Sequence, residues 1–502
     1  MADRGSRGIA WAGAVNLVGG GLGSLIGLVL AAIVGRELGT EGAGTYFLVV
    51  AVFMIVSNVA ELGADTGLVR YISAARATGR LVDVPHLLRT AVPPVVLAGA
   101  LVVVVAAGVV ATTGSLGGLS PAFLVTGAAV AVLSSLLAVV LAVTRGLGDV
   151  LMYPLLQNVT LPLLRVGGVL AVVTAGGGVA AVLTAWMAPV PVVLALAAGV
   201  AVALTLRHSG TLRPSTARPA ERRRLSREFW SFSATRGVTA AVEILLEWID
   251  VILVGALTSP EEAGIYAVVT RCARAGEVIQ QAARIAVGPQ ISAALARGAR
   301  QEAREVYGLV TAAMIWLAWP FFIVLAVFGD AVLSLFGPGF DDGAASLAIL
   351  GLAMGLATAA GTVQTILLMG GRSSWQLADK SVALALNIAL DLALIPLWGI
   401  EGAAVAWAVT IVVDTMLVVY QVQRLMDLRP PAQHLGVAAA LSVGLVGSLT
   451  AASRLVLGSS VLVLLGTLAV VAIVYLAASW PLRQRLGLVD LVAHRSGSMV
   501  SA

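Results

Sequence analysis

The chain has 502 residues, of which 59% are hydrophobic and only 11% are charged, and its formal net charge is +5. A soluble domain carries about 25% charged residues, so this composition excludes an ordinary soluble protein and indicates one that crosses a membrane several times. The basic residues are spread over many short segments. This argues against nucleic-acid binding, for which they would gather on one surface.

Fourteen apolar stretches are long enough to cross a bilayer, which takes roughly 20 residues per helix. They lie at about residues 9–35, 44–69, 87–112, 119–143, 150–174, 179–205, 229–257, 263–290, 306–328, 344–370, 374–398, 402–424, 434–453 and 459–480. The pattern predicts an all-α integral membrane protein with fourteen transmembrane helices.

The first span contains five glycines, at positions 19, 20, 21, 23 and 27. They predict close helix packing, with bending of this helix during transport as the alternative.

The basic residues also predict the orientation. The boundaries between spans alternate between the two sides of the membrane. Of the 31 Lys and Arg residues, six lie inside spans, and only Arg36 and Arg454 lie at the boundaries of one side. All the others lie at the boundaries of the opposite side. Cytoplasmic loops carry an excess of Lys and Arg. We therefore expect a multi-pass protein of the cytoplasmic (inner or plasma) membrane, with both termini and the basic segment 206–228 in the cytoplasm.

The chain lacks the residues that several kinds of catalytic or metal site require. Cys272 is the single cysteine, so no intrachain disulfide can form. The four histidines are far apart in the sequence, and Lys380, the single lysine, is not preceded by the glycine of a Walker A loop. We expect no catalytic residues, no metal and no cofactor other than a coupling Na⁺ or H⁺. A membrane enzyme of glycan assembly is disfavoured because the predicted outer loops are short.

The two halves of the chain repeat. A shift of 220 residues aligns, without a gap, Val34 and Gly35 with Val254 and Gly255, Glu41 with Glu261, Ala43 and Gly44 with Ala263 and Gly264, Tyr46 with Tyr266, and Val49 with Val269. Internal repeats of this kind are typical of secondary transporters. They predict a first six-helix lobe (1–205), a basic cytoplasmic linker (206–228), a second six-helix lobe (229–424), and two further helices with a cytoplasmic tail (425–502).

Three local motifs accompany this layout: the segment Gly39 to Tyr46, the pair Arg70 and Tyr71 that closes the second span, and the segment Gly399 to Ala404 that opens the twelfth. Together they resemble the polysaccharide-transporter branch of the multidrug/oligosaccharidyl-lipid/polysaccharide (MOP) exporter superfamily, to which lipid II flippases and multidrug (MATE) exporters are related. The resemblance implies a flippase, not an enzyme, that carries undecaprenyl-diphosphate-linked oligosaccharide across the membrane by alternating access. It implies membrane lipids, a polysaccharide polymerase and glycosyltransferases as partners.

Spans seven and eight carry an unusual number of charges. By helical periodicity, one face of 229–257 holds Arg236, Glu243, Glu247 and Asp250. One face of 263–290 holds Arg274, Glu277, Gln281 and Arg284, with Arg271 at its edge. Counted from the turn at Pro260, four pairs have matching depths: Asp250 with Arg271, Glu247 with Arg274, Glu243 with Glu277, and Arg236 with Arg284.

These pairs suggest different roles. The two pairs of opposite sign are either structural ion pairs or part of the cavity. Two carboxylates at one depth raise each other's proton affinity, which makes Glu243 and Glu277 candidates for proton coupling. Arginine recognises phosphate through its planar donor fork, so Arg236 and Arg284 are the leading candidates for binding a diphosphate.

The first lobe has its own intramembrane charges. Arg165 lies in the outer half of its span and shares a face with Asn158, and no acid of the first lobe matches its depth. Substrate contact is one interpretation of Arg165, and bonding to a carbonyl or to the second lobe is the other. The acids Glu61 and Asp65 share one face of span two with Asn58, near the cytoplasmic side.

Span eleven places Lys380, Asn387 and Asp391 on one face, and Asp414 lies in the middle of span twelve. Asn387 and Asp391 are one turn apart and resemble the sodium-binding pair of lipid II flippases, with Asp250 or Glu247 as the carboxylate from span seven. Polar packing between helices is the alternative. A multidrug antiporter is the second functional hypothesis, but its cavity should be mainly acidic to bind cationic drugs.

Overall fold

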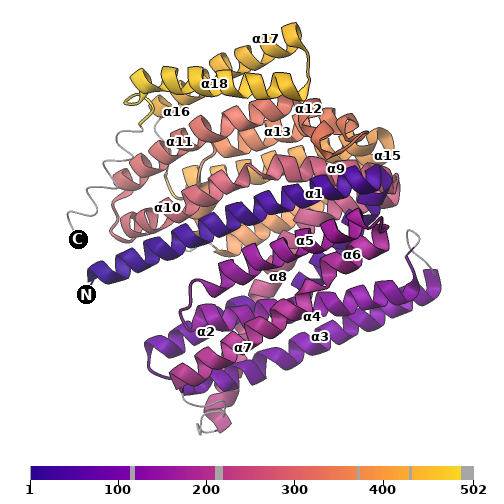
Figure 1. The fold of residues 1–502 in the computed structure, drawn as a ribbon. Helices are drawn as coiled ribbons and strands as arrows, with labels where there is room; N and C mark the ends of the chain where they lie inside the picture. Colours follow the sequence, from indigo (N-terminus) through magenta and orange to yellow (C-terminus); the bar gives the residue numbers. More distant parts are fainter. Residues whose placement is uncertain (1, 114–118, 210–218, 370–372, 429–431, 488–502) are drawn as a thin grey trace. The chain divides into compact units, whose positions relative to one another are not determined.

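The computed structural model describes residues 2–113, 119–209, 219–369, 373–428 and 432–487 (Figure 1). The predicted all-α class is confirmed, since these residues form helices and no β-strand. The first half contains α1 (Ala2–Ala60), α2 (Ala64–Ala77), α3 (Val84–Thr113), α4 (Pro121–Gly146), the π-helix η2 (Pro154–Thr160), α5 (Leu161–Thr174), α6 (Val179–Met187), α7 (Pro189–Ser209) and α8 (Pro219–Leu257).

The second half begins with α9 (Pro260–Arg274), α10 (Glu277–Ala296), α11 (Arg300–Val327), α12 (Gly329–Leu333), α13 (Ala344–Ala359) and α14 (Val363–Met369). It continues with α15 (Ser373–Tyr420), the π-helix η5 (Gln421–Leu425), α16 (Ala432–Leu441), the π-helix η6 (Ser442–Gly447), α17 (Ser448–Leu457) and α18 (Val461–Leu482).

Ten helices among the described residues are long and apolar enough to cross a membrane, so the chain is a multi-pass membrane protein. Two of them contain two predicted spans each, because α1 turns back at Gly39 and α15 at Gly399. Both glycines have positive φ angles, 67° and 55°, which other residues rarely adopt. Spans seven and eight are not among the ten, since α8 carries several charges, α9 has only 15 residues, and α10 contains three glutamines besides Glu277 and Arg284. The fourteen-span count therefore stays a prediction.

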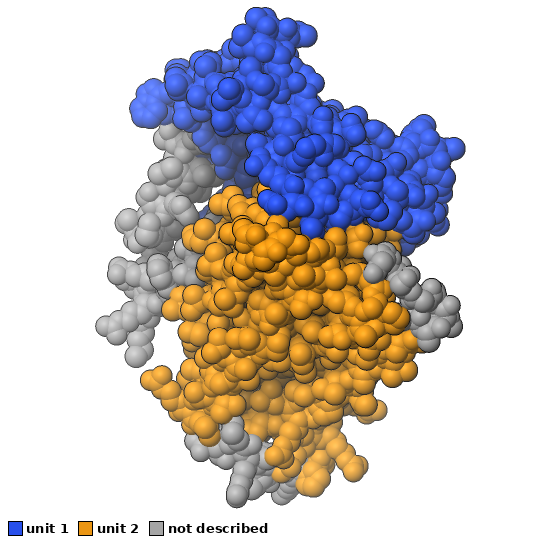
Figure 2. All heavy atoms as spheres, turned by 45° about the vertical axis from the view of Figure 1, so that its right-hand side comes forward, with its two compact units in different colours: residues 1–13, 35–44, 253–502 blue, residues 14–34, 45–252 orange. Residues whose placement is uncertain are grey.

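The chain forms two compact units (Figure 2). Unit 1 comprises residues 1–13, 35–44 and 253–502, and unit 2 comprises residues 14–34 and 45–252. The division falls near the end of α8 and differs from the lobe boundaries inferred from the repeat, which stay a prediction. Helix α8 starts at Pro219, so the end of the predicted linker 206–228 is helical, as a proline in the first turn permits.

Unit 2 has a core that positions α8. Apolar side chains of α2, α3, α4 and α7 surround the fully buried Phe229 of α8. Closer to the middle of α8, Gly237 lies against the backbone of Leu62 and Gly63, where a Cβ on Gly237 would be 2.6 Å from the Leu62 carbonyl carbon. In the first span, a Cβ on Gly23 would lie 3.1 Å from the Asn158 carbonyl oxygen, which confirms close packing there.

In unit 1, the two hairpins of the sequence repeat pack against each other. A Cβ on Gly44 would lie 1.6 Å from the Pro260 carbonyl oxygen, and a Cβ on Gly264 would lie 2.4 Å from the Thr40 carbonyl oxygen. Thr40 also donates a hydrogen bond of 2.8 Å to the Glu261 carboxylate. Gly44 and Gly264 are equivalent positions under the 220-residue shift. The repeat therefore brings equivalent glycines together at a backbone-to-backbone contact.

Adding one methyl group at this contact should destabilise the protein. Gly44→Ala forces the hairpins apart, and we expect a loss of about 1–3 kcal/mol, as for other overpacked sites. Gly27→Ala is the matched control, because nothing lies within 4 Å of its Cβ position. Thermal unfolding of both purified variants measures the difference. An equal melting temperature for the two variants would contradict the contact.

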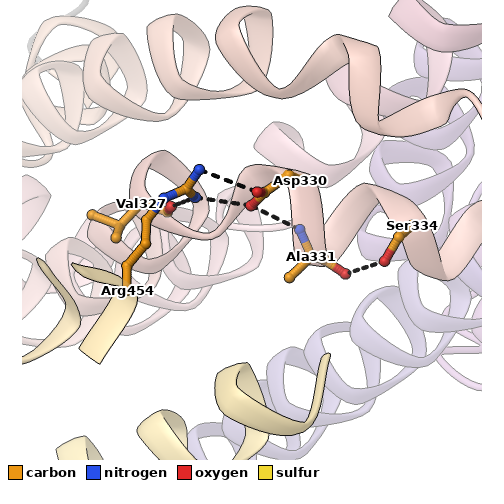
Figure 3. Close-up of polar contacts among 5 residues, drawn as sticks. All are labelled: Val327, Asp330, Ala331, Ser334 and Arg454. Atoms are coloured by element: carbon orange, nitrogen blue, oxygen red, sulfur yellow. Dashed lines mark hydrogen bonds and ion pairs between the residues drawn. The ribbon is translucent and has the colours of Figure 1, made fainter. Parts of the chain in front are cut away.

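The two arginines that break the positive-inside pattern are both bonded to the segment between α11 and α13. Arg36 donates from Nε to the Leu335 carbonyl oxygen at 2.8 Å. Arg454 forms hydrogen bonds of 2.8 and 3.1 Å with the two carboxylate oxygens of Asp330 and a further one with the Val327 carbonyl (Figure 3). These contacts give each outer arginine a structural role, and the second ties α17 to the rest of unit 1.

The Arg454–Asp330 ion pair should make stability depend on pH. Burial works to raise the pKa of Asp330, but bonds from Ser459, the Ala331 N–H and Arg454 together hold this pKa below its ordinary value of 3.8. A carboxylate with a lowered pKa stabilises the fold above its unfolded-state pKa and loses that contribution as pH falls through the folded value. Asp330→Asn should therefore lower the melting temperature at neutral pH, and the deficit should vanish in strong acid.

The exposed outer carboxylate Asp341 supplies the control for this measurement. Asp341→Asn should leave the melting temperature nearly unchanged across the same pH range. If Asp330→Asn does not lower the melting temperature at neutral pH, the Arg454–Asp330 ion pair contributes nothing to stability.

Candidate substrate and coupling-ion site

The acidic face of α8 carries one cation. Arg236 Nη2 lies 3.6 Å from Glu243 Oε2, two turns further along the same helix, and both side chains are about 40% exposed. This separation exceeds the 2.7–2.9 Å typical of a charge-assisted hydrogen bond. Glu247 is exposed, whereas Asp250 is buried. The Arg236 guanidinium is thus loosely held and keeps donors for another anion.

The corresponding charges of unit 1 lie on α9 and α10. The expectation of one continuous helix over 263–290 is corrected, since α9 ends at Arg274 and α10 begins at Glu277. Across this break Arg274 Nε bonds to Glu277 Oε1 at 3.2 Å, and Arg271 donates to the Ala267 carbonyl at 2.8 Å. Arg284 is exposed and has neither a hydrogen bond nor an ion pair within the described chain.

The predicted pairing of charges across spans seven and eight is not tested, because these spans belong largely to different units. Within each unit, the structure instead pairs an arginine with an acid on its own stretch of chain: Arg236 with Glu243, and Arg274 with Glu277. Such pairs compensate the acids locally. Arg284 is left as the cation with the most donor capacity for a ligand.

Arg165 is held by a tryptophan. Its Nε donates to the Trp186 carbonyl oxygen at 3.2 Å, and its guanidinium carbon lies 3.9 Å from the centre of the Trp186 ring. Both a carbonyl bond and a cation–π contact stabilise a guanidinium in an apolar setting. Of the two interpretations drawn from the sequence, the structure therefore shows the carbonyl-bonded one, and the partly exposed side chain keeps its remaining donors.

The acids of the first lobe lie at a helix break. Glu61 follows the end of α1 and Asp65 lies in the first turn of α2, and between them Leu62 has a φ of 53°. A positive φ is uncommon for leucine. Arg145, which the sequence analysis did not select, lies 3.7 Å from the Asp65 carboxylate, and its guanidinium covers the Tyr153 ring at 4.3 Å.

Two fully buried polar residues of unit 1 lie on the first half of α15. Asn387 and Asp391 are both fully buried and one turn apart, and neither polar atom of the Asn387 side chain has a hydrogen-bond partner among the described residues. Lys380 binds Asp414 at 2.7 Å. Sequence reasoning selected Lys380 and Asp414 but did not pair them, and it omitted Asp379, which precedes Lys380 and is as buried as Asp414.

Fold and buried charges together define a polytopic helical membrane protein with arginines and carboxylates on its spans. The chain belongs to the polysaccharide biosynthesis protein family, whose profile matches residues 10–294. This agrees with the resemblance inferred from the sequence.

Two curated relatives, both from Haloferax volcanii, share part of the chain. The probable low-salt glycan biosynthesis flippase Agl15 is 26% identical over 200 residues, which is 38% of this chain and 41% of Agl15. The probable flippase AglR is 25% identical over 201 residues, which is 38% of this chain and 40% of AglR. The chain thus matches about two fifths of the length of these relatives.

Two solved structures share the fold over most of the chain. The lipid II flippase MurJ in an inward closed conformation has a TM-score of 0.73 and 11% identity, covering 94% of this chain and 99% of MurJ. An inward-facing multidrug resistance MATE transporter of the MOP superfamily has a TM-score of 0.65 and 16% identity, covering 81% of this chain and 94% of that one. At these identities the likeness concerns the fold alone.

Proposed function

We propose that the protein is a flippase that moves a polyprenyl-diphosphate-linked oligosaccharide, of the undecaprenyl type, from the inner to the outer leaflet of the cytoplasmic membrane. Its family and the names of its curated relatives support this class of activity. The observation that carries the choice of substrate is the exposed guanidinium of Arg284, which has no partner within the described chain.

The charges on the spans favour an anionic substrate. A cation on a membrane-spanning segment is costly and generally faces a cavity or a partner. A diphosphate offers several anionic oxygens, and arginine binds them bidentately. Arg284 and the loosely paired Arg236 supply this chemistry, with Arg165, Arg271 and Arg274 as further cations. A multidrug antiporter for cationic drugs would not benefit from these arginines.

Binding tests this proposal directly. A ligand that binds the native state raises its melting temperature by mass action. The purified protein should be stabilised by polyprenyl-diphosphate trisaccharide and not by the same lipid without its diphosphate. Lipid II and the drug ethidium are the competing probes. Stabilisation by ethidium alone would indicate an antiporter, and stabilisation by lipid II alone would indicate a peptidoglycan precursor as the substrate.

Ion coupling is part of the proposal. We infer that Asn387 and Asp391 bind Na⁺, because a fully buried amide with both polar atoms unbonded lies one turn from a fully buried carboxylate. Proton coupling through Glu243 and Glu277 is the alternative. The lipid-linked substrate requires glycosyltransferases to build it, and we expect a polymerase to consume it at the outer leaflet.

The proposed direction of transport requires both termini in the cytoplasm. In a Cys272→Ala background, we expect an impermeant maleimide added outside to label Glu41→Cys and to spare His208→Cys, since both native side chains are exposed. Permeabilised cells should label both. The unmodified protein, whose single cysteine Cys272 is buried, serves as the unlabelled control. Labelling of position 208 from outside would reverse the topology.

A further inference from the structure

A second group of buried acids lies on α15 and η5, which we name the Asp379 cluster: Asp379, Lys380, Asp414 and Gln421. Gln421 Nε2 donates to Asp379 Oδ1 at 2.8 Å, and Lys380 Nζ donates to Asp414 Oδ2 at 2.7 Å. Gln364 of α14 donates to the same Asp414 oxygen at 3.2 Å. The two aspartates are each 6% exposed. Each therefore has one bonded carboxylate oxygen.

The remaining polar atoms of the Asp379 cluster are all oxygens. Asp379 Oδ2, Asp414 Oδ1 and Gln421 Oε1 are buried and have no hydrogen-bond partner among the described residues. Buried acceptors are normally satisfied, so this set of oxygens suits a ligand that donates a hydrogen bond or carries positive charge.

The charges of the Asp379 cluster do not balance. Two carboxylates and one ammonium leave a single negative charge, and Asp379 lies within electrostatic range of both Asp414 and Lys380. Burying an uncompensated charge is unfavourable. One additional positive charge would make the cluster neutral.

The elements packed against α15 do not supply that charge. Helices α13 and α14 contain no ionisable side chain. The η5 segment brings Arg424, which is exposed, and the exposed Tyr420 ends α15. Helix α9 approaches α15 at Gly399, where Glu262 lies near its Cβ position, at the opposite end of the span from Asp379. Its two arginines are engaged elsewhere, Arg271 with the Ala267 carbonyl and Arg274 with Glu277.

We propose that the Asp379 cluster holds one exchangeable proton on a carboxylate oxygen of Asp379 or Asp414, at a site separate from Asn387 and Asp391. Protonation of a single carboxylate oxygen would neutralise the negative charge left by the two carboxylates and the one ammonium. The proton comes from water and bonds to a free carboxylate oxygen, and the cluster becomes neutral. This site does not depend on the proposed transport activity.

Infrared spectroscopy of the purified full-length protein tests the site, because a protonated buried carboxylic acid has its own carbonyl stretch. The parent is Asp391→Asn, so that the proposed sodium site does not contribute. We expect a carboxylic-acid band that disappears as pH rises and that Asp379→Asn removes. In Lys380→Met, the carboxylic-acid band should persist to higher pH than in the parent, since losing the neighbouring cation disfavours the ionised carboxylate. Gln421→Leu should have the same effect by removing a donor to the carboxylate.

The control is Asp427→Asn, because Asp427 is 68% exposed and pairs with Arg304 outside the cluster. It should leave the band and its pH dependence unchanged. A parent without a band, or a band that survives Asp379→Asn and ignores both Lys380→Met and Gln421→Leu, would overturn the proposal. Displacement of the band by Na⁺, together with ²²Na⁺ binding that Asp379→Asn abolishes, would also overturn it in favour of a sodium site.

Discussion

Replacing Arg284 and Arg236 together with alanine is expected to abolish flipping while the protein still reaches the membrane. A hydrogen bond to a charged group contributes about 1.5–3 kcal/mol, so each single variant should lower substrate affinity by about tenfold to a hundredfold. The lysine variants should recover part of the activity, because lysine keeps the charge but lacks the bidentate fork. The flipping rate in proteoliposomes, divided by the amount of inserted protein, measures the effect.

Arg297→Ala is the matched control for this experiment. Arg297 is 62% exposed and pairs with Glu302 beyond the end of α10, so its removal changes the net charge by the same amount as either single variant without touching Arg236 or Arg284. Full activity of the Arg236→Ala/Arg284→Ala variant would exclude these residues as the diphosphate site. An equal loss in Arg297→Ala would attribute the effect to charge in general.

Replacing Asp391 with asparagine is expected to uncouple transport from the sodium gradient. In the unmodified protein, an inward or outward sodium gradient should bias the distribution of substrate by about 1.4 kcal/mol for each tenfold difference in sodium concentration. The variant keeps the size of the side chain but loses the charge that would hold the ion. Its substrate should therefore equilibrate between the leaflets without responding to sodium.

Sodium and proton gradients imposed independently on the same proteoliposomes separate the two coupling schemes. Dependence on pH without dependence on sodium, lost in Glu243→Gln or Glu277→Gln, would transfer the coupling role to these acids. Indifference of the unmodified protein to both gradients would refute coupling through either site. A passive flippase driven by consumption of its product would then remain.

Composition and periodicity predicted the parts of the fold that depend on apolar surface. The helical class, the membrane location and the repeat all follow from the spacing of apolar and identical residues. The structure adds a physical reason for the repeat, because Gly44 and Gly264 pack backbone to backbone. Arg36 and Arg454, which broke the charge pattern, are explained only by contacts with Leu335 and Asp330 far away in the sequence.

Helix breaks were not predictable from apolar periodicity. No proline marks the turn at Leu62 and Gly63 or the end of α9, so each region is assigned to one span from its sequence. Leucine carries no signal for the positive φ that it adopts at position 62. A continuous-helix assumption also predicts incorrect relative directions for side chains on either side of such a break, which affects Arg274 and Glu277.

Partners of the buried charges were only partly predictable. Arg236 and Glu243 were expected to share a face, and they form an ion pair on it. The pairing of Lys380 with Asp414 joins the two halves of the α15 hairpin, whose register depends on the turn at Gly399. Asp379 was overlooked because it does not share the face defined by Lys380, Asn387 and Asp391, yet Gln421 bonds to it from η5.

Transbilayer movement of a defined substrate tests the central claim most directly. Proteoliposomes containing the purified protein and a fluorescent polyprenyl-diphosphate trisaccharide are compared with protein-free liposomes and with liposomes containing the Arg236→Ala/Arg284→Ala variant. Reduction of the fluorophore by an impermeant reagent outside reports the fraction exposed. We predict that only the unmodified protein makes the inner-leaflet substrate accessible, and that the same lipid without its diphosphate stays protected. Equal protection of the substrate in all three preparations would contradict a flippase for diphosphate-linked oligosaccharide.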